Sequence, residues 1–249
     1  MTPRLSLLVP FRDADGSRTP AMEWVVARWR HYWPEAELII GTDDGVDPFN
    51  KSMAVNDAAS RATGRTLAIL DADTWMDPAI FEGALRKVEA GIAPWCRPAS
   101  YALRLRRDVS ERLLRLKPTE PLPRIVTAYA ETSSPVVGFL WIVPRAGFER
   151  MGGMDERIRG WGGEDSAFTI AADKVLGRHR AFRGTLICLW HPRPRDERQM
   201  RVWEGQDRRL DEEFKAELIK QYRRASGSAG MLAVLAAAGG PLRAGWASS

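Results

Sequence analysis

The chain has little cysteine and histidine and no long apolar run. Its 249 residues include only two cysteines and three histidines. Cys96 and Cys188 each follow an apolar or aromatic neighbour, which favours buried thiols over a disulfide or a metal pair. No apolar stretch approaches the roughly 20 residues of a membrane-spanning helix. LSLLVPF at 5–11 is too short for a signal peptide and is explained as a first strand. We therefore expect a cytoplasmic protein without a transmembrane segment.

Charge is plentiful, and the basic residues are in excess. Lys and Arg number 37 against 32 Asp and Glu, which gives a net charge of +5 and a pI near 9.5. The excess comes almost entirely from arginine and suits anionic ligands such as nucleotide phosphates, acidic glycans or nucleic acid. A GC-rich genome also enriches arginine, so charge alone selects no partner. With 45% hydrophobic and 28% charged residues, the composition is that of one globular domain.

The most informative stretch of the sequence is an apolar run that ends in two carboxylates, TLAILDAD at 66–73. Uninterrupted apolarity is typical of a parallel strand that is covered on both faces. Strands at 5–9 and 37–41 precede it and alternate with helices at 19–32 and 51–63. This order predicts an α/β fold in a single domain, with a mostly parallel, Rossmann-like sheet flanked by helices.

The remaining elements follow from helical or strand periodicity and from glycine and proline punctuation. Thr19 is the predicted N-cap of the first helix, with Pro20 in its first turn. Further strands are predicted at 136–143 and 185–190, and further helices at 78–89, 109–116, 144–151, 164–175 and 196–224.

Asp71 and Asp73 come directly after the apolar residues of TLAILDAD. Ligands bind at the carboxyl ends of strands in open α/β sheets, and two carboxylates held close together there are unfavourable without a cation. Magnesium or manganese is commonly held by one or two carboxylates together with substrate phosphates. The alternative is a solvated loop before the helix at 78–89, because Asp-x-Asp is short enough to occur by chance.

Polar residues also follow the first two predicted strands. Phe11, Arg12 and Arg18 lie in the loop after the first strand, where an aromatic ring can cover a base and arginines can meet phosphates. Asp43 and Asp44 end the second strand. Taken alone, each is an ordinary polar loop. A basic, proline-punctuated segment at 97–124 is either a solvated face or a mobile flap on the acceptor side.

Glycines surround a tryptophan in MGGMDERIRGWGGEDSAF at 151–168. Such density implies tight turns and backbone close to a ligand. Glu164 and Asp165 open the predicted helix, where capping and the helix dipole alone can explain acidic residues. Capping leaves Trp161, flanked by glycines, unexplained. His191 closes a strand as the aspartates do, although a lone histidine is more often structural than a ligand.

Together these motifs resemble the GT-A glycosyltransferases, specifically glycosyltransferase family 2 and the β-1,4-galactosyltransferase and chondroitin-polymerase group. The resemblance covers about 5–191. VPFRD at 9–13 resembles that group's nucleotide loop, FNKS at 49–52 its FNR-type segment, LDAD at 70–73 its metal-binding motif, and GWGGED at 160–165 its most specific signature. One departure is that Ser166 and Ala167 follow GGED, where members often carry a further acid. This weakens any inference about the sugar.

The resemblance implies a role for each matching residue. The nucleotide pocket comprises Pro10, Phe11, Arg12, Asp43, Phe49, Lys51, Asp71 and Ala72, with Asp43 meeting the uracil. The sugar and acceptor site comprises Trp161, Gly162, Gly163 and Glu164. Asp73 and His191 bind the metal, with Asp71 a further candidate. Asp165 is the general base, and the related retaining polypeptide N-acetylgalactosaminyltransferases typically carry Asn there.

The resemblance therefore predicts an enzyme that uses Mn²⁺ or Mg²⁺ and inverts the anomeric centre. It moves a hexose or N-acetylhexosamine from a UDP-sugar to a hydroxyl of a glycan, a protein or a modified nucleic acid, hydroxymethylated DNA included. A nucleotidyltransferase of similar fold and an inactive sugar-binding relative stay open as alternatives. The predicted domain spans 1–224, with a nucleotide part at about 1–95, an acceptor part at about 96–195 and a helical segment at 196–224. A Gly/Ala/Ser-rich tail follows at 225–249.

Overall fold

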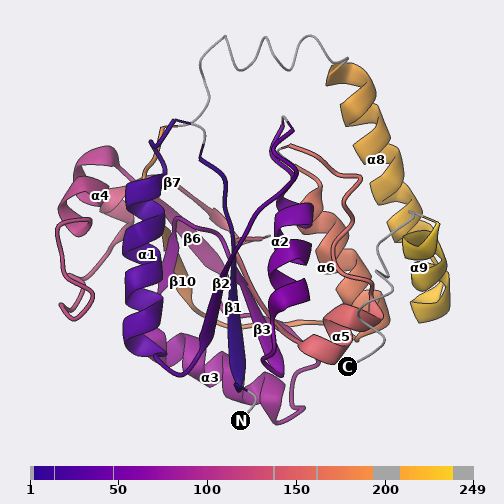
Figure 1. Cartoon of the computed structure of the whole chain (residues 1–249), viewed down its shortest axis with the longest axis horizontal. Coiled ribbons are helices and arrows are strands. Elements are labelled where there is room, and N and C mark those ends of the chain that lie inside the picture. Colours follow the sequence, from indigo (N-terminus) through magenta and orange to yellow (C-terminus); the bar gives the residue numbers. More distant parts are fainter. Residues whose placement is uncertain are drawn as a thin grey trace.

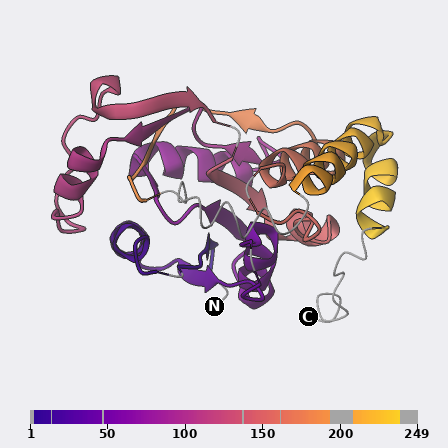
Figure 2. The same ribbon diagram turned by 90° about the horizontal axis from the view of Figure 1, so that it is seen from above.

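Two sheets carry the architecture in the computed structural model of the chain (Figure 1). The structure describes residues 3–13, 15–46, 48–136, 138–160, 162–192 and 208–237. Within these ranges ten strands form one sheet of six and one of four, with helices packed around them (Figures 1 and 2). The predicted α/β class is confirmed.

The six-stranded sheet holds the predicted nucleotide half. Its strands, in spatial order, are β2 (Glu37–Gly41), β1 (Leu5–Pro10), β3 (Thr66–Leu70), β8 (Leu140–Pro144), β5 (Cys96–Arg97) and β9 (Arg180–Ala181). β1 runs parallel to both β2 and β3, whereas β8 runs antiparallel to β3. The strand predicted at 136–143 begins only at Leu140, because Gly138 and Phe139 form a turn in which the Leu140 amide donates to the Gly138 carbonyl.

The four-stranded sheet was not expected from the sequence. Its spatial order is β4 (Thr74–Met76), β10 (Thr185–Cys188), β6 (Tyr101–Leu105) and β7 (Ala130–Pro135). β4 follows the two aspartates and pairs antiparallel with β10. β6 lies inside the basic segment at 97–124, where we predicted a helix at 109–116 but no strand. β10 ends at Cys188 rather than at the predicted residue 190.

Helices cover both faces of the larger sheet. They are α1 (Thr19–Tyr32), α2 (Lys51–Arg61), α3 (Pro78–Glu89), α5 (Arg145–Arg150) and α6 (Glu164–Val175). The helix α4 (Arg107–Leu113) and the short 3₁₀ helix η1 (Thr127–Tyr129) lie in the connection between β6 and β7. Side chains alternate along β1, so Leu7 and Val9 join the core beneath α1 and α3, while Leu8 joins the core beneath α2 and α6. Both faces of the strands are therefore buried, as their apolar runs predict.

Two anchoring contacts differ from the sequence-based expectations. The cap of α1 comes from Asp13, whose carboxylate accepts from the Arg18 and Thr19 amides at 2.8 and 2.7 Å. Thr19 itself is the first helical residue, so its predicted capping role is wrong. On the same helix, the buried Arg28 donates to the Lys117 and Glu120 carbonyls at 3.1 and 2.9 Å. The loop after α4 is thereby tied to α1.

Two further helices, α8 (Arg208–Arg224) and α9 (Gly227–Ala236), pack against α6 (Figures 1 and 2). Tyr222 of α8 and Met231 of α9 are fully buried in the core shared with α6. Lys174 of α6 donates to the Tyr222 and Arg223 carbonyls at 2.7 and 2.8 Å, which caps the last turn of α8. The start of the helix predicted at 196–224 lies outside the described residues. In the described part of the chain, no helix is both long and apolar enough to cross a bilayer.

Candidate active site

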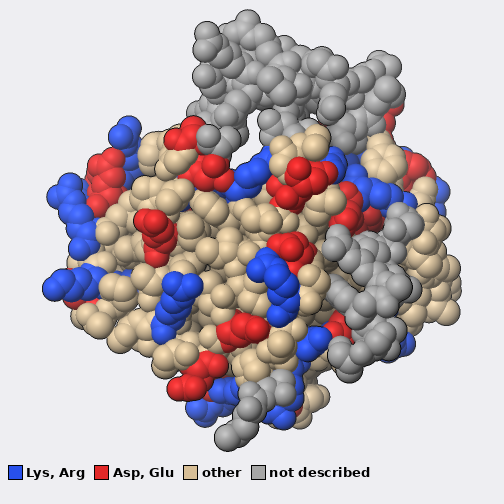
Figure 3. All heavy atoms as spheres, in the orientation of Figure 1, with Lys and Arg blue, Asp and Glu red and all other residues tan. Residues whose placement is uncertain are grey.

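The carboxyl ends of β1, β2 and β3 meet at one edge of the larger sheet because these strands are parallel (Figure 1). Pro10 ends β1, and the amide of Phe11 donates to the last carbonyl of β2 at 3.0 Å. Arg12 then places its guanidinium 3.1 Å from Asp43 and 5.5 Å from the centre of the Phe49 ring. Five residues predicted to line the nucleotide pocket therefore lie together. Acidic and basic side chains also stand side by side near this edge of the surface (Figure 3).

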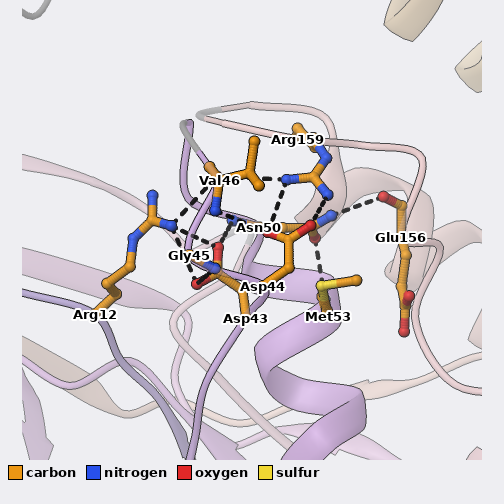
Figure 4. A network of polar contacts seen from close by, with 9 residues as sticks. All are labelled: Arg12, Asp43, Asp44, Gly45, Val46, Asn50, Met53, Glu156 and Arg159. Atoms are coloured by element: carbon orange, nitrogen blue, oxygen red, sulfur yellow. Dashed lines mark hydrogen bonds and ion pairs between the residues drawn. The ribbon is translucent and has the colours of Figure 1, made fainter.

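Two neighbouring aspartates fix the loop between β2 and α2 (Figure 4). The Asp43 side chain is only 1% exposed and also accepts from the Asn50 amide at 2.9 Å. Asp44 pairs with Arg159, and the hydrogen bonds from Arg159 and from the Val46 amide lower the pKa of Asp44 to about 2. Asp43 already holds protein groups, so its predicted contact with uracil stays a prediction.

Lys51 joins the two acidic motifs. Its Nζ lies 2.7 Å from Asp71 and 2.9 Å from Asp165, and it lies 5.0 Å from the centre of the Trp141 ring. Lys51 is the first residue of α2, and the Asn50 side chain caps that helix by accepting from an amide of the first turn. The LDAD and GGED sequences, far apart along the chain, therefore meet at one ammonium group.

Burial and charge perturb the groups around this ammonium. Burial lowers the pKa of Lys51, but the carboxylates of Asp165 and Asp71 outweigh it, and the net pKa is raised. Burial also raises the pKa of Asp71 to about 6 against the opposing charge of Lys51, and Asp165 and Asp73 add to the rise. Burial and then the Asp165 charge raise the pKa of Glu164. The three carboxylates of Asp165, Asp71 and Glu164 thus act on one ammonium, and this excess of negative charge suits an additional cation.

His191 reaches Asp73 because β10 and β4 pair. The Leu189 amide donates to the Asp73 carbonyl at 2.8 Å and continues the ladder past the end of β10. The Nε2 atom of His191 then lies 3.4 Å from Oδ2 of Asp73. Burial tends to raise the pKa of Asp73, but the hydrogen bond and charge of His191 outweigh it, so the pKa is lowered. Two predicted metal ligands from distant strands are therefore adjacent.

The donor set at this pair fits a divalent metal. Nδ1 of His191 lies 2.9 Å from the Pro192 carbonyl, which can only accept, so Nδ1 carries a proton. When the ring is protonated, Nε2 donates toward Asp73. When the ring is neutral, as a metal ligand must be, the Nε2 lone pair faces the Asp73 carboxylate, which is unfavourable unless a cation lies between them. Within the described ranges, no group of three or more His, Cys, Asp or Glu side chains gathers as a metal cage. Asp71, the further candidate ligand, is engaged by Lys51. The pair therefore suits a metal completed by substrate phosphates and water.

Two residues that sequence reasoning missed form the wall beside Asp165. A Cβ on Gly138 would lie 1.8 Å from Oδ2 of Asp165, so only glycine leaves room for this carboxylate. Phe139 has a φ of 72°, which is uncommon for a residue with a side chain, and its carbonyl accepts from the Asp71 amide at 2.9 Å. The available signal was a lone glycine inside an apolar strand pattern, which often marks a close approach of another group.

The loop before α6 is held by two asparagines of the α2 region. The Asn56 side chain accepts from the Met154 amide and donates to the Met154 carbonyl, both at 2.8 Å. Asn50 donates to the Glu156 carbonyl at 2.8 Å (Figure 4). The helix that supplies Lys51 therefore also positions the glycine-rich loop.

The predicted sugar and acceptor residues lie at the end of this loop, except that Trp161 is outside the described residues. Gly162 and Gly163 have φ values of 96° and 92°, in the left-handed region that favours glycine. Glu164 is buried, and its Oε2 atom has no hydrogen-bond partner among the described residues. The Asp165 side chain is 27% exposed. Asp165 is thus the carboxylate of the pair that reaches solvent.

A small surface hollow lies beside Asp73 and His191, with Arg104 of β6 and Glu131 of β7 in its walls. The Arg104 guanidinium lies 5.0 Å from the centre of the Phe139 ring. It makes no hydrogen bond or ion pair with any residue that the structure describes. An arginine that no described side chain pairs with at this place can contact an anionic ligand, although Asp73 and Glu131 line the same hollow. No local sequence pattern distinguishes it from the other arginines of its segment. The remaining predicted pocket residue, Ala72, is buried in the turn between Asp71 and Asp73.

A sequence profile described as the N-terminal domain of galactosyltransferase matches residues 126–174. The matched segment is less than half of the chain and contains Gly138, the glycine-rich loop, Glu164 and Asp165. The match supports a glycosyltransferase enzyme. No curated protein matches the chain.

Several solved structures resemble this chain at low identity. The catalytic domain of Drosophila β1,4-galactosyltransferase 7 with xylobiose is 18% identical, with a TM-score of 0.43, over 72% of this chain and 63% of that one. A mutant of that enzyme with manganese, UDP-Gal and xylobiose has the same identity and coverage and a TM-score of 0.40. S. aureus TarS 1–349 is 11% identical, with a TM-score of 0.43, over 74% of this chain and 60% of that one. The present chain spans less than two thirds of each, and the bound molecules belong to those proteins.

Proposed function

We propose that the protein is a metal-dependent, inverting glycosyltransferase. It moves a hexose or N-acetylhexosamine from a UDP-sugar to a hydroxyl acceptor. The observation that carries the proposal is the contact of Lys51 with both Asp71 and Asp165, next to the Asp73–His191 pair. A nucleotide-side carboxylate, a candidate base and a candidate metal pair thereby share one edge of the sheet.

Asp165 serves as the general base. Its Oδ1 atom is held by Lys51, and its Oδ2 atom takes the proton of the acceptor hydroxyl. The acceptor oxygen forms a bond to the anomeric carbon as the bond between that carbon and the diphosphate oxygen breaks, and the electron pair leaves with the diphosphate. Attack from the face opposite the leaving group inverts the configuration. Lys51 orients Asp165, and Gly138 leaves room for Oδ2.

The nucleotide is bound by Arg12, Phe49 and the residues around them, with the aromatic ring against the base and the cationic groups toward the phosphates. Asp73 and His191 hold the divalent metal, which neutralises charge on the leaving diphosphate when it is bound. Arg104, in the adjacent hollow and in no ion pair with a described residue, is a second cationic contact for the same diphosphate. Manganese is the metal that we expect to work best.

The acceptor is a glycan, a protein or a modified nucleic acid such as hydroxymethylated DNA. The basic segment at 97–124 favours an anionic acceptor without requiring one. Most of the charges of α4 are paired locally, since Arg107 pairs with Glu111 and Arg112 with Asp108. This lowers the positive charge that the segment offers to a polyanion.

A nucleotide-release assay over a panel of nucleotide sugars and acceptors, with Mn²⁺ present, tests the proposal. We expect UDP as the product and a loss of transfer after thorough chelation. Release of pyrophosphate would instead identify a nucleotidyltransferase. Binding of sugars with no turnover under any pairing would identify an inactive relative.

A further inference from the structure

The helix α8 lies beyond both the motif resemblance and the matched family segment, yet it contacts the loop that carries the candidate base. Lys215, Leu218 and Tyr222 recur at helical spacing and are buried at 4%, 2% and 0% exposure, so they form the inner stripe of α8. A Cβ on Gly163 would lie 3.9 Å from Cβ and Cδ of Lys215. The inner face of α8 therefore lies against the entry to α6.

Tyr222 directs its hydroxyl at a carboxylate of this loop. It donates to Oδ2 of Asp155 at 2.8 Å. Asp155 is 2% exposed in its side chain and also accepts from the Arg157 amide at 3.0 Å and from the Arg157 guanidinium at 2.7 Å. Burial raises the pKa of Tyr222, so its hydroxyl remains a donor at neutral pH. The three groups make a buried polar corner in the first part of the loop.

The loop is thus held from two sides. The α2 region binds it through Asn56 at Met154 and through Asn50 at Glu156, and α8 binds it through Tyr222 at Asp155. Beyond these contacts the loop runs through the glycines directly into α6. The intervening backbone is itself held, because Ile158 is buried and the Gly160 amide donates to the Phe49 carbonyl at 3.0 Å. A displacement of the corner is therefore passed toward the first turn of α6 through a packed backbone.

We infer that Tyr222 is a positioning residue that holds the loop at 154–163, and through it Asp165, in the arrangement needed for transfer. The inference rests on the proposed function and extends the site to a helix outside the matched region. Any buried tyrosine needs an acceptor for its hydroxyl, so the informative feature is which group accepts. Here the hydroxyl bonds the loop and not α6 or α9.

The test compares Tyr222→Phe with the wild-type full chain, since this change removes one hydroxyl and preserves the ring. Hydrogen exchange measures the amides at 154–163, calorimetry measures UDP affinity, and steady-state assays separate kcat from KM. We expect faster exchange in the loop and a kcat lower by about 10-fold or more, because small misplacements of reacting groups are costly. UDP affinity and exchange in β1, β2 and β3 should match the wild type.

Leu235→Ala is the matched control because it removes buried apolar contact on α9, which packs on α6 and α8. It should lower Tm without a loop-specific change in exchange. A Tyr222→Phe protein that behaves like wild type or like Leu235→Ala would overturn the inference.

A double-mutant cycle with Asp155→Asn tests whether Tyr222 affects kcat and loop exchange through its hydrogen bond to Asp155. If Tyr222 acts through Asp155, adding Tyr222→Phe to Asp155→Asn changes kcat and loop exchange little further, whereas fully additive effects contradict that route. If the wild type transfers no sugar, the proposed function fails. The exchange measurement then still decides whether Tyr222 positions the loop.

Discussion

Replacing Lys51 with methionine should destabilise the protein through the two carboxylates that the substitution leaves behind. The Lys51 ammonium lies 2.7 Å from Asp71 and 2.9 Å from Asp165. At an effective dielectric constant of about 20, each contact corresponds to roughly 6 kcal/mol of gross attraction, which desolvation largely offsets. Breaking a buried ion pair costs about 3–5 kcal/mol. Because the two aspartate side chains are 23% and 27% exposed, water enters and we expect a loss of about 2–4 kcal/mol.

Urea unfolding of Lys51→Met and wild type at pH 7.5 and pH 5 measures this loss. The pKa of Asp71 is raised to about 6 although Lys51 opposes the rise, so it rises further in the variant. At pH 5 Asp71 is therefore protonated in the folded variant, and the repulsion between the carboxylates is relieved. The loss of stability should be smaller at pH 5 by on the order of 1 kcal/mol.

Lys220→Met on α8 is the control. Lys220 is 56% exposed and lies 3.4 Å from Glu217, an exposed pair that contributes about 0–1 kcal/mol. If Lys51→Met costs no more than Lys220→Met, or if its cost does not depend on pH, Lys51 does not bridge the two motifs in solution and the account of the site is wrong.

Three further predictions concern the same site. The pKa of Asp71 in the folded protein lies above its ordinary value of 3.8, so the stability that protonated Asp71 contributes is full below pH 4 and is lost as the pH rises through about 6. In urea titrations, the unfolding free energy of wild type relative to Asp71→Asn should fall over that pH window. A difference between the two proteins that does not change with pH would contradict the raised pKa. Gly138→Ala should lower kcat by about 10²-fold because the added methyl group displaces the Asp165 side chain, whereas the UDP affinity measured by calorimetry should stay unchanged. A variant with wild-type kcat would show that the backbone at Gly138 can move away from Asp165. Arg104→Gln should weaken Mn²⁺–UDP binding by on the order of tenfold, as expected for loss of a charge-assisted contact, while Arg112→Gln on α4 should not; equal effects would remove Arg104 from the diphosphate site.

The parallel half of the fold was predictable because its signals are local. Apolar runs of strand length define β1, β2 and β3, and proline or glycine marks the helix ends between them. The bounds of α3 and α6 match the predicted ranges 78–89 and 164–175. Each of these helices has an acidic or glycine boundary that the sequence displays directly.

The four-stranded sheet was not predictable in the same way. The strand β7, AETSSP, is a polar edge strand with mostly exposed side chains, so it lacks the apolar alternation on which strand prediction depends. β6 carries arginine inside a segment rich in proline and charge. Its pairing with β10 is a long-range choice that local sequence does not encode.

Sequence motifs predicted the candidate residues of the site, whereas their contacts with one another can be seen only in the folded structure. Motif reading grouped Lys51 with the nucleotide pocket, but its joint contact with Asp71 and Asp165 depends on how α2 meets α6. Gly138 interrupts an apolar strand pattern, which signals a close approach, but only the folded backbone shows that the approaching group is Asp165. Tyr222 lies outside every motif.

The kcat of Asp165→Asn decides whether Asp165 is the general base. Asparagine keeps the size of the side chain and much of its capping ability but cannot accept the proton. We expect kcat to fall by roughly 10²- to 10⁴-fold, with Mn²⁺–UDP affinity near wild type and Tm lowered by only a few degrees through the lost contact with Lys51. An Asp165→Asn enzyme that retains most of its wild-type kcat would contradict the account and would move the search for the base to Glu164.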